Sequence, residues 1–600
     1  MAAGGVFAGR RRSLANRVSA GGSGRYARAM SITVSDQNDT NGRRSADTRP
    51  KRERLGRGPA LALAWGVPFA LVLTVLLVRN AFLFSTPEYE DADMAANSIL
   101  IEQARRFTLL VGNYSRERFN HPGPAFLYVQ SWGESLFYDA LHVVPAPWNG
   151  QLIALYALNA LFAASVVAVG YGCTGSLRGA AVTLAAVLLF GVLHPAMFSS
   201  DWMPYVYVPA YLAFIVALAS VAAGHTRDAW IAALAGWFLI HGHACFLVFV
   251  PVLAAASLAV VLWSRRKEKA EGIERAVFSP PPPRVLVPVA VISAVFALPI
   301  VIELVLHWPG NFGKYLSYSS SSSAGGHPVV RVAEYVLWFW WPHAHAWAVA
   351  GALVAVAALL AWRLPACPAR RFCLALLAVD AASTAAFACY AAVGVDALDD
   401  RYIGYFYWSA PVIALLVIAL SATELLASAT TPASAAALRS AAALAPAAVA
   451  VMAACAALVA FAVAPQTRLS MDHVDPADPG TGPIADPSLP AGVAAIARVA
   501  AGRPAVLTFA HNAWPAITGI LVQAERTGVT ACVASQSWEF MMTSQFICTR
   551  AELASGRGLH VYVPGTVPKT ARVLFRLAHG VVTTQGPRRR ASAGHSDHRG

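Results

Sequence analysis

Long apolar segments constrain this chain more than any other feature. Eleven windows of roughly twenty residues are apolar enough to cross a bilayer: 60–84, 150–171, 178–196, 203–223, 228–243, 244–263, 285–306, 345–362, 371–393, 403–425 and 438–463. Of the 600 residues, 57% are hydrophobic and only 13% are charged, which is too little charge to cover a soluble protein of this length. The sequence therefore predicts a polytopic α-helical membrane protein with about eleven transmembrane helices.

The placement of Lys and Arg predicts the orientation of these helices. Residues 1–60 hold thirteen Lys or Arg against four Asp or Glu, and later basic residues fall in every second loop. Cytoplasmic loops carry such an excess, so we expect the N-terminus inside and residues 85–149 and everything after residue 464 outside. Topology thus accounts for the formal charge of +14, and we expect no nucleic-acid partner.

The composition divides the chain into four parts. Residues 1–58 are rich in Arg, Ser and Gly without apolar periodicity, so we expect a disordered basic cytoplasmic tail, with Met30 as an alternative start. Residues 59–464 form the membrane domain, whose first outer loop is 85–149. Residues 465–585 form the one sizeable folded region outside the membrane, and 586–600 form a second disordered basic tail.

The outer region 465–585 has the pattern of a small α/β domain. After a linker rich in Pro, Asp and Gly, apolar runs at 505–509, 529–534 and 559–563 alternate with helical stretches such as 513–526, which predicts a parallel sheet. Cys532 and Cys548 both fall in this domain, and an extracytoplasmic location favours a disulfide between them. The domain has no glycine-rich phosphate loop, so we predict no nucleotide site.

An acidic cluster directly follows the first apolar window and consists of Glu88, Glu90, Asp91 and Asp93. One interpretation is that Asp91 or Asp93 caps the helix predicted to run towards Arg106, a role that contributes about 1 kcal/mol. The other is that one of them is a general base, because partial desolvation beside the membrane raises the pKa of a carboxyl group. The pattern leaves both interpretations open.

Histidines and a further acid also lie on the predicted outer side. His121 stands in the rigid turn 120–124, which either only redirects the chain or presents the histidine to a phosphate oxygen. Asp201, between the third and fourth windows, is either a solvated loop acid or a residue that supports the base or binds sugar hydroxyls. His241 and His243 form a His-x-His pair without a third ligand nearby in the sequence, so we predict no metal site, although a divalent metal is not excluded.

Three cations lie near the predicted outer surface, namely Lys314, Arg331 and Arg401. Arg401 matches a phosphate best because its planar fork can donate two parallel hydrogen bonds. The alternative is that Asp399 or Asp400 merely neutralises it. The neighbouring Tyr402 belongs to a group of outer aromatic residues, most of which suit the membrane interface and some of which could stack on sugar rings.

These features together resemble the GT-C superfamily of integral membrane glycosyltransferases, which use polyprenyl-phosphate sugar donors. The resemblance rests on the acidic motif 88–93 after the first helix, the Pro-rich element 121–128, about a dozen spans and an outer C-terminal domain, and covers most of residues 60–464. The first loop looks most like that of aminoarabinose transferases, protein O-mannosyltransferases and actinobacterial arabinosyl- or mannosyltransferases.

The resemblance implies a role for each candidate residue. An acidic residue of the first outer loop is the proposed base in these families, which here falls on Asp91 or Asp93, with Asp91 narrowly favoured. The remaining candidates are expected to bind substrate: Glu90, His121, Asp201, Lys314, Arg401 and Tyr402. No cofactor is expected, because the energy for transfer is stored in the donor's phosphate linkage.

The sequence therefore predicts transfer of a sugar from a polyprenyl-phosphate donor to an envelope glycan, lipid or protein at the outer face of the plasma membrane. A single base in one loop predicts inversion at the anomeric carbon. Two other hypotheses stay open: a transporter or flippase of envelope precursors, which should carry buried charges at mid-membrane, and a non-catalytic envelope scaffold.

Overall fold

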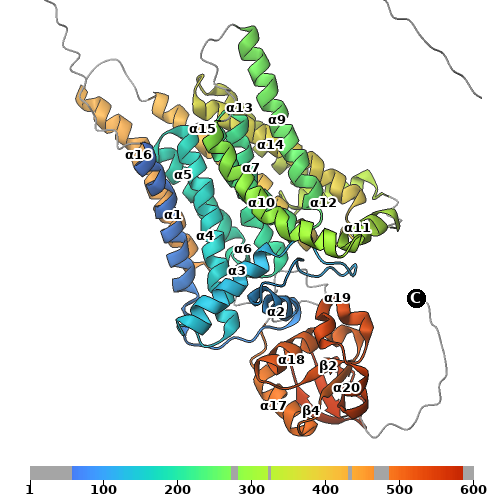
Figure 1. Ribbon diagram of the computed structural model, residues 1–600. Coiled ribbons are helices and arrows are strands. Elements are labelled where there is room, and N and C mark those ends of the chain that lie inside the picture. Colours follow the sequence, from blue (N-terminus) through green and yellow to red (C-terminus); the bar gives the residue numbers. More distant parts are fainter. Residues whose placement is uncertain (1–56, 272–281, 322–325, 430–435, 465–484, 585–600) are drawn as a thin grey trace, which may run out of the picture. The chain divides into compact units, whose positions relative to one another are not determined.

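The computed structural model describes residues 57–271, 282–321, 326–429, 436–464 and 485–584 (Figure 1). The disordered tails predicted at 1–58 and 586–600 lie outside these residues, apart from the first two residues of a helix. The helices of the membrane part that matter below are α1 (Arg57–Arg79), α2 (Ala92–Arg105), α3 (Ala125–Gly133), α4 (Pro147–Thr174), α5 (Leu177–Leu193), α6 (Ala196–Ser199), α7 (Met203–Ala222), α8 (Ala229–Gly242), α9 (Phe246–Ala270), α10 (Pro283–Leu306), α11 (Gly310–Ser321), α12 (Val329–Trp338), α13 (Ala346–Arg363), α14 (Pro368–Val393), the 3-10 helix η4 (Arg401–Trp408), α15 (Ser409–Ala429) and α16 (Ala436–Val463).

Every one of the eleven predicted windows coincides with a helix, and the chain is a multi-pass membrane protein. Among the described residues, nine helical segments are long and apolar enough to cross a bilayer. The two others, α5 with 17 residues and α8 with 14, are shorter than a full crossing requires. That α5 and α8 also cross the bilayer, which would make eleven spans, therefore stays a prediction.

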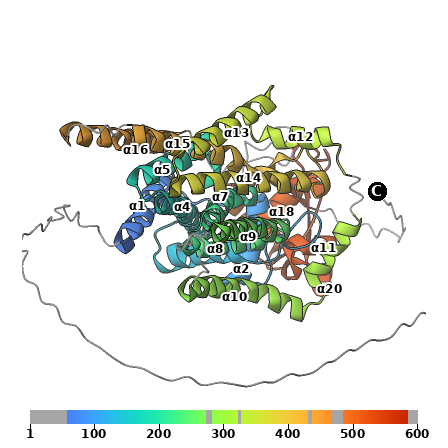
Figure 2. The ribbon, with the colours of Figure 1, turned by 90° about the horizontal axis from the view of Figure 1, so that it is seen from above.

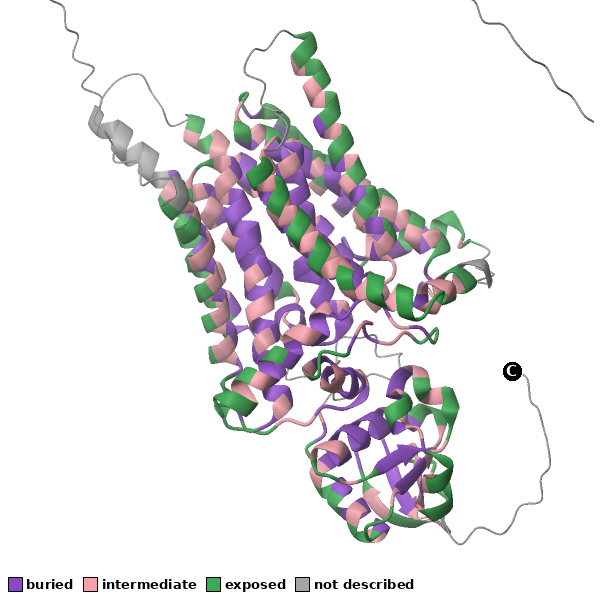
Figure 3. Cartoon of the chain, in the orientation of Figure 1, coloured by how far each residue is buried: buried purple, intermediate pink, exposed green. Residues whose placement is uncertain are grey.

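Helix α7 lies at the centre of the membrane part. Figure 2 shows it among α4, α8, α9 and α14, all of which it contacts. Of its apolar window 94% is buried by protein, whereas none of the window of α10 is buried. Figure 3 shows the same contrast, with α7 buried and α10 largely exposed. An apolar helix left uncovered by protein suits contact with lipid chains, because lipid is as apolar as its side chains.

The loop after α1 folds into two short helices, α2 and α3. Asp91 is the N-cap of α2, as one interpretation of the acidic cluster predicted, and its side chain accepts a hydrogen bond from the Ala92 backbone. Helix α2 packs against α3 on one side and against α18 (Trp514–Arg526) of the C-terminal part on the other (Figure 1). Its buried residues are therefore not confined to one stripe, since α2 is covered from two directions.

The C-terminal part contains a five-stranded sheet in the order β2-β1-β3-β5-β4. The strands are β1 (Ala505–Phe509), β2 (Ala531–Val533), β3 (Arg557–Tyr562), β4 (Arg572–Arg576) and β5 (Val581–Thr584). The first three are parallel and coincide with the three predicted runs. The prediction of a parallel sheet was incomplete, because β4 and β5 add an antiparallel edge. Both are short, and β4 carries Arg at each end, which hides the strand pattern.

Candidate active site

The two candidate bases differ in exposure although they are two residues apart. The Asp91 side chain is fully buried, and its Oδ1 accepts from the Ala92 N–H at 2.9 Å. A Cβ added at Gly519 of α18 would lie 2.9 Å from this Oδ1, so the C-terminal part covers the carboxyl group directly. Burial raises the pKa of Asp91 to about 8, so this carboxyl group is mostly protonated at neutral pH.

Asp93 is only half-buried, and hydrogen bonds from other side chains hold both of its carboxylate oxygens. Its Oδ1 accepts from the Tyr114 hydroxyl, and its Oδ2 accepts from Trp202 Nε1 at 2.8 Å. It lies in the first turn of α2, where the helix dipole favours a negative charge.

Glu90 is buried and anchors the acidic loop to the C-terminal part. Its two oxygens receive a forked ion pair from Arg526 of α18, with Nη1–Oε2 2.9 Å and Nη2–Oε1 2.7 Å. Ser98 of α2 also donates to Oε1 at 2.5 Å. Both carboxylate oxygens of Glu90 therefore bind protein partners, and its 0% exposed side chain is not presented to a substrate.

The backbone around Glu90 makes further contacts with the C-terminal part. The Asp486 N–H donates to the Tyr89 carbonyl at 2.9 Å, and the Thr518 hydroxyl donates to the Ala92 carbonyl at 3.0 Å. Contacts thus flank the loop on both sides of Asp91. The segment that carries both candidate bases has its conformation fixed by residues some four hundred positions later in the chain.

Asp201 is also buried, between α6 and α7. Its Oδ2 accepts from Trp148 Nε1 at 2.8 Å and from Gln130 Nε2 at 3.1 Å. Its Oδ1 is buried without a hydrogen-bond partner in the described structure. Burial raises the pKa of Asp201 to about 6. The interpretation as a solvated loop acid was wrong, because the side chain is 1% exposed.

Aromatic side chains from α7, from the residue before it and from η4 gather beside Asp93. The Trp202 ring, which holds Asp93, lies 5.2 Å from Tyr402 and 5.8 Å from Tyr205. Tyr205 in turn packs 5.2 Å from Tyr405, which stacks on Trp408 at 4.1 Å. The sequence predicted aromatic residues on this side, and the fold brings these five into one group next to a carboxylate.

Arg401 is next to this aromatic group in the chain, and none of the described Asp or Glu side chains forms an ion pair with it. Its guanidinium carbon lies 5.2 Å from the centroid of Tyr335 and 5.4 Å from that of Trp338. Its Nη1 is buried without a hydrogen-bond partner among the described residues. A buried N–H donor that lacks an acceptor is unfavourable by about 1–3 kcal/mol.

The acids expected to neutralise Arg401 pair with other residues. Asp400 accepts from Arg116 at 2.7 Å, and Asp399 accepts from Arg331 at 3.1 Å. Arg116 also donates to the Tyr402 hydroxyl at 3.2 Å, which connects the first loop to η4. The alternative in which Asp399 or Asp400 neutralises Arg401 is therefore wrong.

The histidines serve as anchors of the backbone in this structure. His121 is buried, its Nδ1 accepts from the Ala244 N–H at 3.2 Å, and its ring lies 4.4 Å from His243. Burial lowers the pKa of His121 well below its usual value, so the ring is neutral. His241 accepts from the Ala125 N–H at 3.2 Å and donates to the Phe296 carbonyl at 2.7 Å. In the described ranges, no three His, Cys, Asp or Glu side chains come together as a metal-ligating group.

Lys314 is exposed on α11, and no described contact links it to the other candidates. The same helix contacts the first loop through other residues, since Asn311 Oδ1 accepts from the Asn120 N–H at 3.1 Å. Trp202 therefore links Asp93 to Tyr402. Arg401 adjoins Tyr402 in the chain, but its guanidinium packs on Tyr335 and Trp338. Glu90 and Asp91 are buried under the C-terminal part, and no described contact joins Lys314 to the other candidates. Sequence reasoning missed Tyr114 and Arg526, and no local pattern marks either residue.

Comparison with known proteins finds a similar structure but no match by sequence. No protein-family model and no curated protein matches the sequence. The structure resembles the crystal structure of ArnT from Cupriavidus metallidurans in the apo state, with a TM-score of 0.50 and 13% identity over 88% of this chain and 100% of that chain. The same protein bound to undecaprenyl phosphate matches with a TM-score of 0.48, 13% identity and the same coverage.

This chain has the fold of ArnT. The likeness extends over the full length of the ArnT chain. At 13% identity the match establishes the fold and leaves the site to be argued from the residues above.

Proposed function

We propose that the protein is an integral membrane glycosyltransferase that moves a sugar from a polyprenyl-phosphate donor to an acceptor hydroxyl, with Asp93 as the general base. One observation carries the proposal. In a chain with the fold of ArnT, Asp93 is a half-buried carboxylate held by Tyr114 and Trp202 at the start of a helix, and Trp202 belongs to an aromatic group that includes Tyr402.

Asp93 replaces Asp91 as the favoured base, which reverses the order that the sequence suggested. A general base must be ionised and must come within about 3 Å of the proton that it takes. Asp91 meets neither requirement, because α18 covers its carboxyl group and burial raises its pKa to about 8. Asp91 instead caps α2 and so positions Asp93.

The proposed reaction is a single inverting displacement. Asp93 accepts the proton of the acceptor hydroxyl, whose oxygen attacks the anomeric carbon of the donor sugar. The bond between that carbon and the phosphate oxygen breaks, and the polyprenyl phosphate leaves with the bonding electrons. Arg401 is proposed to bind the departing phosphate through its free Nη1 donor, and Tyr402 to pack against the sugar.

The proposed location is the outer face of the plasma membrane, with the N-terminus in the cytoplasm. The alternation of Lys and Arg between loops supports this orientation. The first loop, η4 and the C-terminal domain would then all face the extracytoplasmic side. A polyprenyl-phosphate donor carries its own activation, so this site requires no nucleotide there.

One observation favours the transport hypothesis as a second candidate. Asp380 lies at the middle of α14, is only 5% exposed, and has a buried Oδ1 without a described hydrogen-bond partner. An ionisable residue inside a membrane helix is commonly functional. Loss of precursor translocation in Asp380→Asn, with normal transfer of externally supplied donor, would support transport.

The test of the proposal is to compare Asp93→Asn with Asp91→Asn in cells and in a purified transfer assay. We expect Asp93→Asn to remove one sugar linkage from the envelope and to accumulate its lipid-linked donor, while membrane abundance stays normal. Asp91→Asn should retain transfer. Retention of anomeric configuration in the product, or unchanged glycans in Asp93→Asn, would refute the mechanism.

A further inference from the structure

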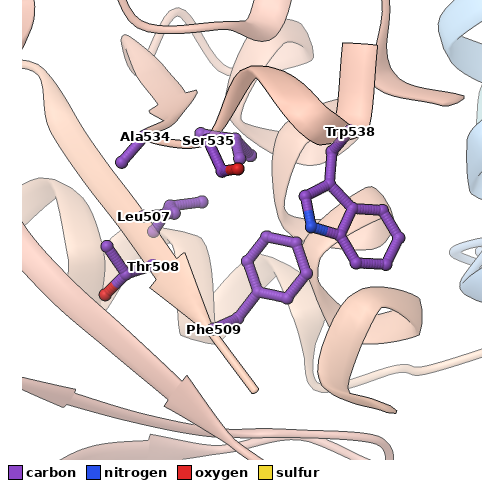
Figure 4. Close-up of a pocket in the computed structure, with 7 residues that line it drawn as sticks. Leu507, Thr508, Phe509, Ala534, Ser535 and Trp538 are labelled. Carbon is purple, nitrogen blue, oxygen red and sulfur yellow. The ribbon is translucent and has the colours of Figure 1, made fainter. Parts of the chain in front are cut away.

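A pocket opens at the carboxyl ends of β1 and β2 in the C-terminal domain (Figure 4). Its volume of about 360 Å³ falls within the range of about 300–1,000 Å³ that small-molecule sites occupy. In α/β sheets, ligands bind outside the carboxyl ends of parallel strands. We call it the sheet-edge pocket, and it is lined by Leu507, Thr508, Phe509, Val533, Ala534, Ser535 and Trp538.

The lining of the sheet-edge pocket indicates a neutral ligand with hydroxyl groups. None of its seven residues is charged, which disfavours phosphates, nucleotides and charged peptides. Phe509 and Trp538 form an aromatic wall with ring centroids 5.0 Å apart, and Figure 4 shows both rings on one side of the pocket. Ser535 is exposed beside them and carries a hydroxyl. Sugar rings present flat C–H faces to aromatic rings and hydroxyls around their edges, so they fit both features.

A disulfide constrains the segment that carries this wall. Cys532 of β2 is bonded to Cys548, the pair for which the sequence predicted a bond. The closed loop contains Ser535, Trp538 and the nearby Phe540. Closure of a loop of this length restricts the unfolded chain and contributes about 3 kcal/mol. Trp538 of the aromatic wall is therefore held on a stabilised segment, whereas Phe509 is held by β1.

Aromatic rings connect the sheet-edge pocket to the candidate base. Trp538 stacks near Phe540 with centroids 6.1 Å apart, and Phe540 packs edge-on against Tyr114, also at 6.1 Å. The Tyr114 hydroxyl then donates to Asp93. A row of three aromatic side chains, joined by two ring contacts and ending in a hydrogen bond, therefore runs from the pocket to the carboxylate.

We propose that the sheet-edge pocket binds a neutral saccharide unit of the acceptor, so that the acceptor of this enzyme is a glycan chain. The proposal rests on the glycosyltransferase function above and adds the class of the acceptor. A glycan held at Trp538 would extend along Phe540 and Tyr114 and present a terminal hydroxyl to Asp93. Tyr114 is then a positioning residue that contacts both the acceptor chain and the base.

The test is to measure, by saturation-transfer NMR, the binding of neutral oligosaccharides to the full-length protein in lipid nanodiscs. The probes are arabino-, galacto- and manno-oligosaccharides of several units. We expect one series to bind, and Trp538→Ala to weaken its binding about tenfold. With that series as acceptor, the same variant should raise the acceptor KM with little change in kcat or in the donor KM. Trp538→Phe, which keeps an aromatic ring, should restore most of the binding.

Two controls keep the outcome decisive. Trp132→Ala removes the same side chain from a site that is 58% exposed on α3, and should change neither binding nor KM. Ser535→Arg blocks the pocket from an exposed position, and replaces Trp538→Ala if that variant does not fold. No binding of any series to the wild-type protein, or binding that both pocket variants leave intact, would overturn the inference.

The pocket inference and the proposed function fail in different ways. If the transferase function is wrong, Asp93→Asn leaves envelope glycans unchanged, whereas oligosaccharide binding still depends on Trp538. If the pocket inference is wrong, Asp93→Asn abolishes transfer, whereas Trp538→Ala leaves both oligosaccharide binding and the acceptor KM as in the wild type.

Discussion

The buried Asp91 carboxyl group makes the stability of the acidic loop depend on pH in a defined direction. Burial raises its pKa to about 8, whereas in the unfolded chain an Asp has a pKa of about 3.9. The folded state therefore binds more protons than the unfolded state between about pH 4 and 8. Folded stability is highest below this window, falls as pH rises through it, and levels off above the folded pKa.

The size of this effect follows from the two pKa values. At pH 7 the unfolded Asp is ionised and folding must protonate it, which opposes folding by about 4 kcal/mol, with a slope of roughly 1.4 kcal/mol per pH unit. Asp91→Asn removes the proton uptake and keeps an amide oxygen to cap α2. We therefore expect Asp91→Asn to flatten the pH dependence and to stabilise the loop at pH 7 by a few kcal/mol.

Hydrogen exchange of the amides in α2 and α18 between pH 5 and 8 measures this local stability, after correction for intrinsic exchange rates. Asp399→Asn is a matched control, because the Asp399 side chain is 82% exposed and its removal should leave the slope unchanged. A slope in Asp91→Asn equal to that of the wild type would refute the reasoning, since Asp91 would then be ionised in the folded protein. Loss of transfer in a stable Asp91→Asn variant would return the role of base to Asp91.

Three further perturbations test other parts of the site. Arg526→Met leaves Glu90 buried without its ion pair and should destabilise α2 by about 3–5 kcal/mol in the same exchange experiment, whereas adding Glu90→Gln should restore part of this loss. Arg401→Lys keeps the charge but removes the fork, so the donor KM should rise about tenfold while the acceptor KM stays constant, and equal donor KM values would contradict a phosphate role. Cys532→Ser with Cys548→Ser should lower the stability of the C-terminal domain by about 3 kcal/mol, measured by limited proteolysis of the full chain in urea, and unchanged cleavage would contradict the loop-closure argument.

Much of the fold could be predicted because its signals are local. Apolar windows identified each membrane helix, and three apolar runs identified the parallel strands β1, β2 and β3. The sequence offered Asp91 or Asp93 as an N-cap because capping depends on neighbouring backbone groups, and the structure shows that Asp91 is the cap. The strands β4 and β5 were not predicted because they are short and show little alternation of apolar and polar residues. The short lengths of α5 and α8 were not predicted because hydropathy does not show where a helix ends.

The candidate site was predictable in its residue types and less so in their roles. The acidic motif after α1 and Arg401 in its loop both stood out in the sequence, since ionisable residues beside apolar segments are uncommon. Their partners did not, because Tyr114, Trp202 and Arg526 are ordinary residues that matter only through their positions in space. The pairing of Asp399 and Asp400 with Arg331 and Arg116 shows the same limit.

The sequence by itself determined that this is a multi-pass membrane protein with a small α/β domain, because hydrophobicity and strand runs are properties of short segments. Only the tertiary structure decided which acid is buried and which is half-buried, since Gly519 and Arg526 approach the acidic loop from a helix more than four hundred residues away. The pKa of a carboxyl group depends on its surroundings, so two aspartates two residues apart acquire different roles once α18 packs over one of them.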